Sequence, residues 1–313
     1  MAVTAEIIDG VKIAAELEEQ LRREVAALPG GRLDGALATV SVGETFQSTA
    51  YQRRLQRLAR RLDLPYEHHG LPAAATEQSL MDTIAVLGDD PKVAGILLLR
   101  PLPAHIRESS VFAALLPEKD VEAVHPENAG MLALGTPRFV PSTAASAYHV
   151  LDTWLDRVGE DRVRFYENAT IVVVGRSNNV GKPAVSLAYQ RHAAVTSIDE
   201  WSGRGSRLGF HTRRADVLIV AAGVPGLIGA EHVREGAIVL DIGINPAPSK
   251  HSSDVRIVGD VAFAEVLDRA RAITPVPGGI GPVTDVRLFQ NVVLAQHNRV
   301  PGPTCQDPVR TPR

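Results

Sequence analysis

The sequence contains one cysteine, Cys305, within the proline-rich segment PGPTCQDPVRTPR. A single cysteine excludes an intramolecular disulfide framework, because a disulfide needs two thiols, and it excludes a metal site built from cysteines. We predict no metal site in this protein. The composition of residues 299–313 is typical of a disordered tail, since it offers few apolar side chains to bury.

An excess of one charge is also missing, since 33 basic residues stand against 36 acidic residues and the formal net charge is -3. No global field therefore favours nucleic acid or an anionic membrane. Apolar runs such as VAGILLL and VLIVAAGV are far shorter than the ~18 residues of a membrane span, and the first residues, MAVTAEIIDG, lack the features of a secretion signal. We expect a cytoplasmic protein that binds neither nucleic acid nor membrane.

Five arginines lie within residues 49–63, TAYQRRLQRLARRLD. Leu55, Leu58 and Leu62 recur three and four residues apart, which predicts an amphipathic helix with one apolar stripe packed on a core. The arginines could form a solvated basic face, a nucleic-acid helix, or part of an active-site helix that lacks a usual group. The short run and its single aromatic residue, Tyr51, count against nucleic acid.

The first half of the sequence alternates strand-like and helical patterns. ALATVSVG and VAGILLLRPLP predict strands, and residues 49–63 and the segment QSLMDTIAVLGDD predict helices. This order favours a parallel sheet covered by helices. A long helical pattern, TAASAYHVLDTWLDRV, then leads into a second unit that begins near residue 150.

Strand-like runs recur through the second unit, each followed by a loop or a helix. They are TIVVVG, AAVTSID, ADVLIVAAG, AIVLDIG and VRIVGDV. This is the order of a doubly wound nucleotide-binding sheet. The last pattern, DVRLFQNVVLAQHNR, predicts a helix that packs back on the first unit. We therefore predict a two-domain α/β fold.

Gly175 ends the strand-like run IVVVG, and Gly181 opens the next element. Glycines at these places allow a tight turn and a close approach of backbone N–H groups to phosphate. Their spacing differs from the usual G-x-G-x-x-G, so plain turn chemistry stays an alternative. Asp199 and Glu200 follow the next strand. An acid there can accept the hydroxyl groups of an adenosine ribose and repels a 2′-phosphate, so Asp199 favours NAD over NADP.

Several longer segments are more specific. VVVGRSNNVGKP, ADVLIVAAGVP, GAIVLDIGIN, VGDVAF and ITPVPGGIGPVT closely resemble the bifunctional methylenetetrahydrofolate dehydrogenase/cyclohydrolase family. VSVGETFQSTAY, GILLLRPLP, PEKDVEAVHPEN and VPSTAAS fall in the order and spacing of that family. The resemblance covers nearly the whole chain up to about residue 297, and on these segments the chain is identified as a member of the family.

The resemblance implies an N-terminal α/β domain for the folate, a Rossmann domain for the dinucleotide, and a cleft between them. We place the substrate domain at residues 1–148, completed by a helix at 283–298, the NAD(P)-binding domain at 149–282, and the tail at 299–313. The family resemblance further implies a homodimer and two reactions. The first is hydride transfer from the methylene carbon of 5,10-methylenetetrahydrofolate to NAD(P)⁺, and the second is hydrolysis of the methenyl product to 10-formyltetrahydrofolate.

The arginine-rich helix resembles the family helix that carries a Tyr-x-x-x-Lys pair. Tyr51 matches the tyrosine that stacks on the aminobenzoate of the substrate, but Leu55 occupies the position of the catalytic lysine. Leucine cannot donate a hydrogen bond, take a proton or orient water. Leu99 occupies the position of the glutamine that partners this lysine, so two facing polar groups have become apolar together. The catalytic residue is therefore unknown.

The other expected substrate contacts also follow from the resemblance. Glu122 stands where an aspartate of the family holds the pterin, and Arg100 stands where a leucine is usual. The segment Pro277, Gly278 and Gly279 belongs to a loop between the domains, which its prolines and glycines make rigid. We expect a tetrahydrofolate derivative as the substrate.

The expected cofactor contacts are Gly175, Arg176, Ser177, Val180, Gly181, Lys182, Asp199, Gly223 and Ile244. Arg176 matches a family contact to the 2′-phosphate of NADP and thus argues against the indication from Asp199. An ion pair between the two side chains would neutralise the pull of Arg176 on phosphate. We expect NAD as the preferred cofactor and NADP as the alternative.

Three functions stay open from the sequence. The first is an NAD-dependent methylenetetrahydrofolate dehydrogenase without cyclohydrolase activity, because hydride transfer needs two rings held face to face and no proton-transfer group. The second is a paralogue that uses the same hydride geometry on a different C–N or C=N substrate, which Leu55, Leu99 and Arg100 favour. The third is a non-catalytic nucleotide-binding partner.

Overall fold

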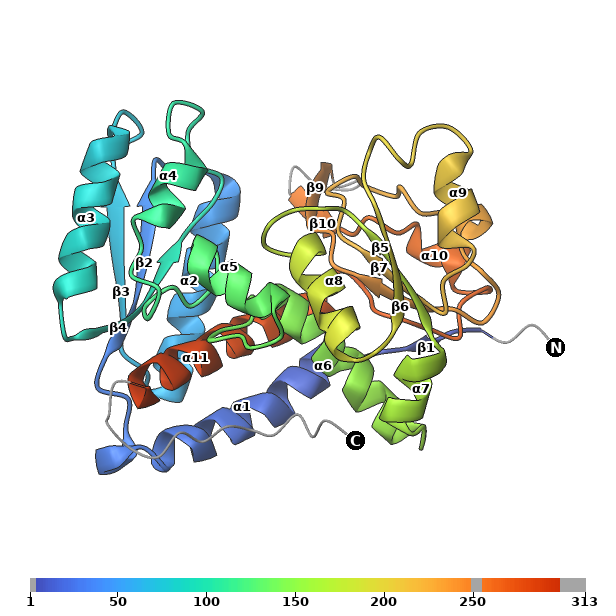
Figure 1. The fold of residues 1–313 in the computed structure, drawn as a ribbon, viewed down its shortest axis with the longest axis horizontal. Helices are drawn as coiled ribbons and strands as arrows, with labels where there is room; N and C mark the ends of the chain where they lie inside the picture. Colours follow the sequence, from blue (N-terminus) through green and yellow to red (C-terminus); the bar gives the residue numbers. More distant parts are fainter. Residues whose placement is uncertain (1–3, 249–254, 299–313) are drawn as a thin grey trace.

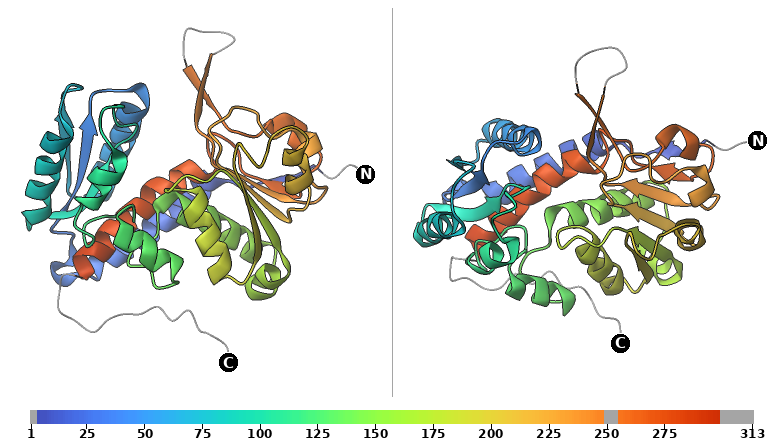
Figure 2. Two further views of the ribbon diagram at one scale, coloured as in Figure 1. Left: turned by 45° about the horizontal axis from the view of Figure 1, so that its top comes forward. Right: turned by 90° about the horizontal axis from the view of Figure 1, so that it is seen from above.

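The structure of the chain is a computed structural model that describes residues 4–248 and 255–298. Two parallel sheets, each flanked by helices, lie beside each other and are connected by long helices (Figure 1). Further views place the two sheets at opposite ends of the molecule (Figure 2). The predicted two-domain α/β fold is confirmed.

The smaller sheet has the order β3-β2-β4, with β2 (Ala36–Val42), β3 (Tyr66–Leu71) and β4 (Val93–Leu98). Its helices are α2 (Phe46–Leu62), α3 (Glu77–Asp89) and α4 (Glu108–Ala113). Leu80 of α3 belongs to one apolar cluster with Val40 of β2, and Leu55 of α2 belongs to another with Leu37 of β2. Because both faces are covered, β2 and β4 are buried along almost their whole length.

The larger sheet has six parallel strands in the order β1-β11-β8-β7-β5-β6. The strands are β1 (Glu6–Ile7), β5 (Thr170–Val174), β6 (Ala194–Ile198), β7 (Val217–Val220), β8 (Ile238–Asp241) and β11 (Ala272–Ile273). Around it lie α7 (Arg162–Asn168), α8 (Gly181–Gln190), α9 (Arg207–Thr212) and α10 (Phe263–Val266). Four of the predicted strands thus correspond to β5, β6, β7 and β8.

The first strand of the chain lies in the larger sheet, although the sequence analysis assigns all residues before 149 to the substrate domain. Ile7 of β1 pairs with Ile273 of β11. Each of these strands has only two residues, which gives no periodicity to recognise in the sequence. The larger sheet uses residues from both sides of the predicted boundary, and the domain limits stay a prediction.

The prediction that VRIVGDV adds a strand to the nucleotide-binding sheet is wrong. Its first residues form β10 (Val255–Val258), which pairs antiparallel with β9 (Asn245–Pro248) in a separate two-stranded ribbon. The connection between β9 and β10 is too short for the crossover that a parallel neighbour requires, whereas antiparallel strands need only a short loop. Pro246 in β9 also lacks a backbone N–H group, which suits an edge position.

Three long helices connect the two sheets: α1 (Gly10–Ala26), α6 (Ser142–Arg157) and α11 (Ile280–His297). Helix α11 packs along α1 and α6 and also contacts β4 of the smaller sheet. The prediction of a last helix that packs back on the first unit is therefore confirmed. The predicted tail at 299–313 lies outside the described residues.

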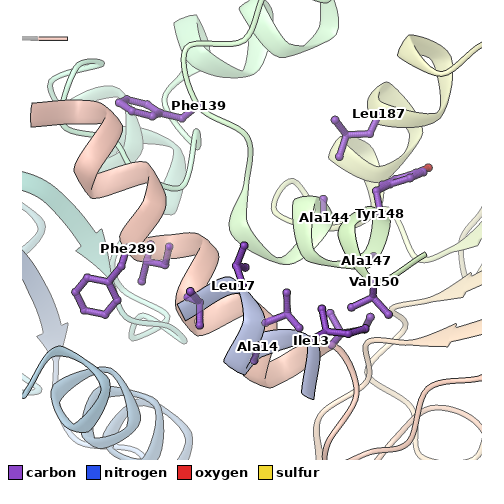
Figure 3. Packing of buried hydrophobic residues seen from close by; sticks show 14 of the residues in the cluster. Ile13, Ala14, Leu17, Phe139, Ala144, Ala147, Tyr148, Val150, Leu187 and Phe289 are labelled. Carbon is purple, nitrogen blue, oxygen red and sulfur yellow. The ribbon is translucent and has the colours of Figure 1, made fainter. Parts of the chain in front are cut away.

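One hydrophobic cluster extends from the smaller sheet through the three long helices to the larger sheet. Figure 3 shows Leu17 of α1, Tyr148 of α6 and Phe289 of α11 within it. All three side chains are almost completely buried. Close packing of this kind fixes the helices relative to one another. The elements that carry the two halves of the candidate site are thus held by a shared core.

Two arginines of α2 form ion pairs with neighbouring helices. Arg54 donates two hydrogen bonds to the carboxylate of Asp285 in α11, at 3.0 and 3.3 Å. Arg61 forms an ion pair with Glu18 of α1. The predicted apolar stripe of leucines on the same helix is buried. The charged face therefore serves in part to join α2 to the long helices.

The remaining helical segments are α5 (Pro126–Ala133) and the short 3-10 helices η1 (Pro29–Gly31) and η2 (Ala230–His232).

None of the helices in residues 4–248 and 255–298 combines the length and the apolar character that a membrane crossing requires.

Candidate active site

The turn between β5 and α8 is closely packed at its two glycines. Gly175 has a φ of 117°, and a Cβ atom there would lie 2.1 Å from the carbonyl oxygen of Ala221. A Cβ atom on Gly181 would lie 2.0 Å from the carbonyl oxygen of Gly175. Both distances are far below van der Waals contact, so only glycine fits at either position without backbone movement. The turn brings the N-terminus of α8 against the end of β5.

Side chains of the same turn hold its shape. The Ser177 hydroxyl accepts hydrogen bonds from the backbone N–H groups of Val180, at 3.2 Å, and Gly181, at 3.4 Å. Lys182 Nζ donates to Asn178 Oδ1 at 2.7 Å, which keeps the ammonium group at the turn. A cation beside a helix N-terminus makes a favourable place for a pyrophosphate.

Arg176 and Asp199 form an ion pair at the ends of β5 and β6. Arg176 Nη1 donates to Asp199 Oδ2 at 2.9 Å, and its other nitrogens donate to Ser197. The backbone N–H and the hydroxyl of Ser202 donate to Asp199 Oδ1 at 2.8 and 2.7 Å. The hydrogen bonds from Ser202 and the nearby Arg176 cation hold the pKa of Asp199 below its usual range. Asp199 is therefore ionised, and its carboxylate forms an ion pair with the guanidinium group of Arg176.

Two buried aspartates that the sequence analysis did not select organise the neighbouring loops. Asp260 Oδ2 accepts hydrogen bonds from the backbone N–H groups of Ala222 and Gly223, at 2.6 and 2.8 Å. Asp241, at the end of β8, accepts from three backbone N–H groups at 2.9 to 3.0 Å. Burial raises the pKa of Asp241 to about 6, although these hydrogen bonds oppose the change. The two carboxylates fix the loops that carry two of the predicted cofactor contacts, Gly223 and Ile244.

Three residues of this region differ in exposure. Gly223 and Ile244 are exposed, so the structure leaves both accessible to a ligand at the ends of β7 and β8. Asn179, which the sequence analysis did not select, is buried in the turn before α8. Its Oδ1 atom has no hydrogen-bond partner within the described residues. A buried acceptor of this kind is normally satisfied, and a ligand hydroxyl would satisfy it.

On the smaller sheet, Tyr51 of α2 lies near charged groups from three other segments. The guanidinium carbon of Arg54 is 5.0 Å from the centre of the Tyr51 ring. Burial raises the pKa of Tyr51, and the carboxyl groups of Glu122 and Asp285 raise it further. Tyr51 therefore keeps its phenolic proton near neutral pH and can donate a hydrogen bond.

Glu122 lies between β4 and α5, partly buried, beside the start of α6. The Ser142 hydroxyl donates a hydrogen bond to Glu122 Oε1 at 2.5 Å. Burial raises the pKa of Glu122 to about 7, while the Ser142 hydrogen bond and the Arg100 cation oppose this rise. Glu122 thus changes its charge near neutral pH. It can accept hydrogen bonds as a carboxylate or donate one as an acid.

Arg100 follows β4 and is exposed, with its Nη1 atom 4.0 Å from the Glu108 carboxylate. Its positive charge lowers the pKa of both Glu122 and Tyr51. The structure therefore brings Tyr51, Arg100 and Glu122, which come from separate segments of the sequence, into one region. Their contact with a substrate stays a prediction.

The loop of Pro277, Gly278 and Gly279 connects β11 to α11 and packs against the start of α1. The backbone N–H of Gly10 donates to the carbonyl oxygen of Gly278 at 2.9 Å, and a Cβ atom on Gly10 would lie 1.7 Å from the carbonyl oxygen of Gly279. Pro277 is exposed. In the part of the chain that the structure describes, no hydrogen bond or ion pair links this loop to Tyr51.

Comparison with known proteins places both units in one family. The family model described as tetrahydrofolate dehydrogenase/cyclohydrolase, catalytic domain, matches residues 8–122, and the model for the NAD(P)-binding domain of the same enzymes matches residues 141–300. Bifunctional protein FolD 3 of Rubrobacter xylanophilus is 52% identical over 292 residues, which cover 93% of this chain and 92% of that protein. The chain belongs to the tetrahydrofolate dehydrogenase/cyclohydrolase family.

Solved structures agree with this assignment. The FolD methylenetetrahydrofolate dehydrogenase/cyclohydrolase of Campylobacter jejuni matches with a TM-score of 0.85 and 32% identity, over 95% of this chain and 100% of that chain. The Trypanosoma brucei enzyme, complexed with NADP and an inhibitor, matches with a TM-score of 0.84 and 30% identity, over 94% and 98% of the two chains. The predicted family and the predicted class of methylenetetrahydrofolate dehydrogenase-like oxidoreductase are confirmed, and an NAD(P)-binding domain is present.

The two leucines at the positions where the sequence resemblance expects a lysine and a glutamine are buried on the substrate side. Leu55 is 0% exposed and Leu99 is 2% exposed, and both belong to the main hydrophobic cluster. Neither side chain has a polar atom, so neither leaves a buried donor or acceptor unpaired. Both leucines are therefore compatible with a closely packed apolar interior.

Proposed function

We propose that the protein is an NAD-dependent methylenetetrahydrofolate dehydrogenase that binds its substrate between the two units. Hydride leaves the methylene carbon of 5,10-methylenetetrahydrofolate as a hydrogen nucleus with two electrons and reduces NAD⁺ to NADH, which leaves the methenyl cation. The step requires that the folate ring with the methylene carbon and the nicotinamide ring be held face to face at short distance, and it requires no proton-transfer group. In support, the turn at Gly175 and Gly181 is closely packed, and Tyr51 and Glu122 lie near each other on the substrate side.

We further propose that the cyclohydrolase activity is lost, and the complete burial of Leu55 carries this proposal. Hydrolysis needs a group that activates water and handles a proton. Leu55 is 0% exposed, belongs to the main hydrophobic cluster, and has no group that can take up or release a proton. Arg54, the nearest cation on the helix, is engaged with Asp285, and a guanidinium does not release a proton near neutral pH.

Hydrolysis of methenyltetrahydrofolate by the wild type is accordingly expected not to exceed the rate in buffer. Leu55→Lys combined with Leu99→Gln should restore part of this activity, because the amide can pair with the new ammonium group. Absorbance of the methenyl compound follows the reaction. The matched control is Leu58→Lys with Leu99→Gln, which places the lysine elsewhere on the same buried stripe and should stay inactive. Clear hydrolysis by the wild type would contradict this proposal.

The proposed preference for NAD rests on the ion pair of Arg176 with Asp199. A 2′-phosphate would have to displace the Asp199 carboxylate from Arg176, and the two anions would repel each other. The ribose hydroxyl groups of NAD carry no charge and can donate to Asp199. NADP is the alternative cofactor in this proposal, since Arg176 would bind its phosphate if Asp199 turned away.

Asp199→Ser is expected to raise the ratio of kcat/KM for NADP to that for NAD by about tenfold, the scale of one charge-assisted hydrogen bond. The substitution removes a repelling charge and releases the Arg176 guanidinium for the phosphate. Steady-state kinetics with both cofactors measures the ratio. Glu200→Gln is the matched control, because Glu200 is an exposed neighbouring acid, and it should change the ratio little. An unchanged ratio in Asp199→Ser, or a wild type that prefers NADP, would show that Arg176 governs the site.

We also propose the domain limits given by the sequence, with a substrate domain at 1–148 completed by 283–298 and a cofactor domain at 149–282. The family resemblance supports a homodimer that acts in the cytoplasm, with a folate and a dinucleotide as its ligands and without nucleic acid or membrane as partners.

A second candidate function is hydride transfer on a different C–N or C=N substrate. Arg100 favours it, because the exposed cation lies close enough to Glu122 to lower its pKa, next to the apolar wall at Leu99. A new cation and a new apolar wall select a different ligand from the one that a polar pocket binds. The responses of folate binding to Glu122→Gln and Arg100→Leu separate the two functions.

A further inference from the structure

A cavity of about 300 Å³ lies among α6, α8, α11 and the segment before α6. None of its lining residues is among the predicted substrate or cofactor contacts. Helix α6 contributes Ala145, His149 and Asp152, which lie on one face because they are four and three residues apart. Helix α11 contributes Arg287, Asn291 and Leu294 with the same spacing. The cavity is therefore built from matching faces of helices that join the two sheets.

Two of the three arginines at the cavity are neutralised by carboxylates. Arg138 donates to Glu127 at 2.8 Å. Arg191 donates to Asp152 at 3.1 Å, and Asp152 also accepts a hydrogen bond from a tyrosine. These arginines keep further N–H groups, because a guanidinium group has five donors. Their charges nevertheless need no additional anion.

Arg287 differs from the other two. It forms no ion pair within 4.0 Å in the described ranges of the chain, and its Nε atom is buried without a hydrogen-bond partner there. Its Nη1 atom donates to the neutral amide oxygen of Gln290 at 3.0 Å. Burial lowers the pKa of Arg287, and the nearby Arg191 cation acts in the same direction against the carboxylates of Glu24 and Asp152. The cavity thus borders a largely buried cation that no carboxylate contacts directly, although Glu24 and Asp152 act on it from a greater distance, and burial of such a cation is costly.

Apart from the three arginines and the Asp152 carboxylate, which pairs with Arg191, the cavity is lined by apolar or neutral side chains. Phe139 and Leu187 line it, and they lie on different elements above α6 (Figure 3). His149 is neutral near pH 7, because burial and the Arg287 cation lower its pKa to about 4. A bare inorganic ion would contact Arg287 but leave the apolar walls uncovered. An anion with an apolar body would contact both Arg287 and the apolar walls.

From the cavity, its apolar walls and the Arg287 cation, which no carboxylate contacts directly, we propose that this site binds a small organic anion through a phosphate or carboxylate group. The planar guanidinium group of Arg287, which lines the cavity, matches the two oxygens of either group. Asn291 supports the wall of the site, since it donates to the carbonyl oxygens of Val121 and Val140 at 2.8 Å. The site is independent of the proposed dehydrogenase activity.

Calorimetric titration of phenyl phosphate and of benzoate into the full chain tests the proposal. At least one of them should bind with a dissociation constant below about a millimolar, and phenol, which lacks the charge, should not. Arg287→Gln should weaken the binding at least tenfold, and Arg287→Lys should weaken it less. Arg164→Gln, which removes an exposed arginine of α7, is the matched control and should leave the affinity unchanged.

Thermal unfolding separates loss of the site from loss of the fold. Without ligand, Arg287→Gln should unfold at a temperature no lower than the wild type, because the substitution removes a buried cation that has no carboxylate partner. Phenyl phosphate or benzoate should raise the unfolding temperature of the wild type and not that of Arg287→Gln. Binding that disappears in Lys182→Gln and persists in Arg287→Gln would place the anion at the turn before α8 and overturn the proposal. Absence of binding for both anions would also overturn it.

Discussion

Alanine in place of Gly181 is expected to weaken NADH binding by about a hundredfold or more, a loss of some 2.8 kcal/mol. The added Cβ atom would lie 2.0 Å from the carbonyl oxygen of Gly175 and 2.6 Å from its carbonyl carbon. Both are backbone atoms, so the clash cannot be relieved by rotation of a side chain, and the turn between β5 and α8 must open. Opening moves the helix N-terminus from the place where it would hold a pyrophosphate. Titration of NADH fluorescence measures the effect.

Gly130→Ala is the matched control for this experiment. Gly130 lies in α5, its φ is not positive, and no atom lies within 4 Å of the added Cβ. Alanine also favours the helix over glycine. The control should bind NADH like the wild type and unfold at the same or a slightly higher temperature. If Gly181→Ala stays folded and retains wild-type affinity, the turn before α8 is not the dinucleotide site.

The larger sheet is predictable from the sequence where its signals are local. β5 and β7 are runs of β-branched and leucine residues followed by loops, and they are recognised without knowledge of the rest of the chain. β1 and β11 become strands only because they pair with each other and with β8. β10 has the composition of a sheet strand, but the short connection from β9 commits it to an antiparallel ribbon. Tertiary context decides these last assignments.

The candidate site divides in the same way. Gly175 and Gly181 are found from their places at the end of a strand-like run and the start of the next element, because the turn between them requires glycine. Asp241 and Asp260 lie within two residues of a glycine in LDIG and VGDV, yet a carboxylate that accepts loop N–H groups has the same sequence pattern as a solvated loop acid. The cavity at Arg287 depends on helix faces that are far apart in the sequence. Contacts between such distant helix faces follow from the packing of the long helices, which no local sequence pattern encodes.

Glu122→Gln is expected to weaken tetrahydrofolate binding by about ten- to a hundredfold if the protein acts on folate. The Glu122 carboxylate would accept charge-assisted hydrogen bonds from the amino-pyrimidine edge of the pterin, each worth roughly 1.5–3 kcal/mol, and an amide accepts only neutral ones. The affinity for NAD should be nearly unchanged, because Glu122 lies on the substrate side. Calorimetric titration of tetrahydrofolate with NAD saturating measures both effects.

The same experiment has an expected pH dependence. Burial raises the pKa of Glu122 to about 7, so the carboxyl group is largely protonated at pH 6 and largely ionised at pH 8. If the ionised form binds the pterin, affinity for tetrahydrofolate rises as pH increases through 7 and falls by about tenfold for each unit below the pKa. Glu122→Gln cannot ionise and should lose this dependence. Persistence of the full pH dependence in the variant would assign it to another group.

Arg100→Leu distinguishes folate from a different substrate. If folate is the substrate, Arg100 is a bystander whose main effect is to lower the pKa of Glu122, so its removal should shift the pH dependence of binding upward and leave the affinity at pH 8 within a few-fold. If the substrate is another anionic or carbonyl compound, the order inverts. The wild type then binds tetrahydrofolate weakly, Glu122→Gln changes that binding little, and Arg100→Leu abolishes turnover of the true substrate. A wild-type dissociation constant for tetrahydrofolate weaker than about a millimolar, some 4 kcal/mol of binding free energy, would exclude folate, because the charge-assisted hydrogen bonds to Glu122 alone should supply a large part of that amount.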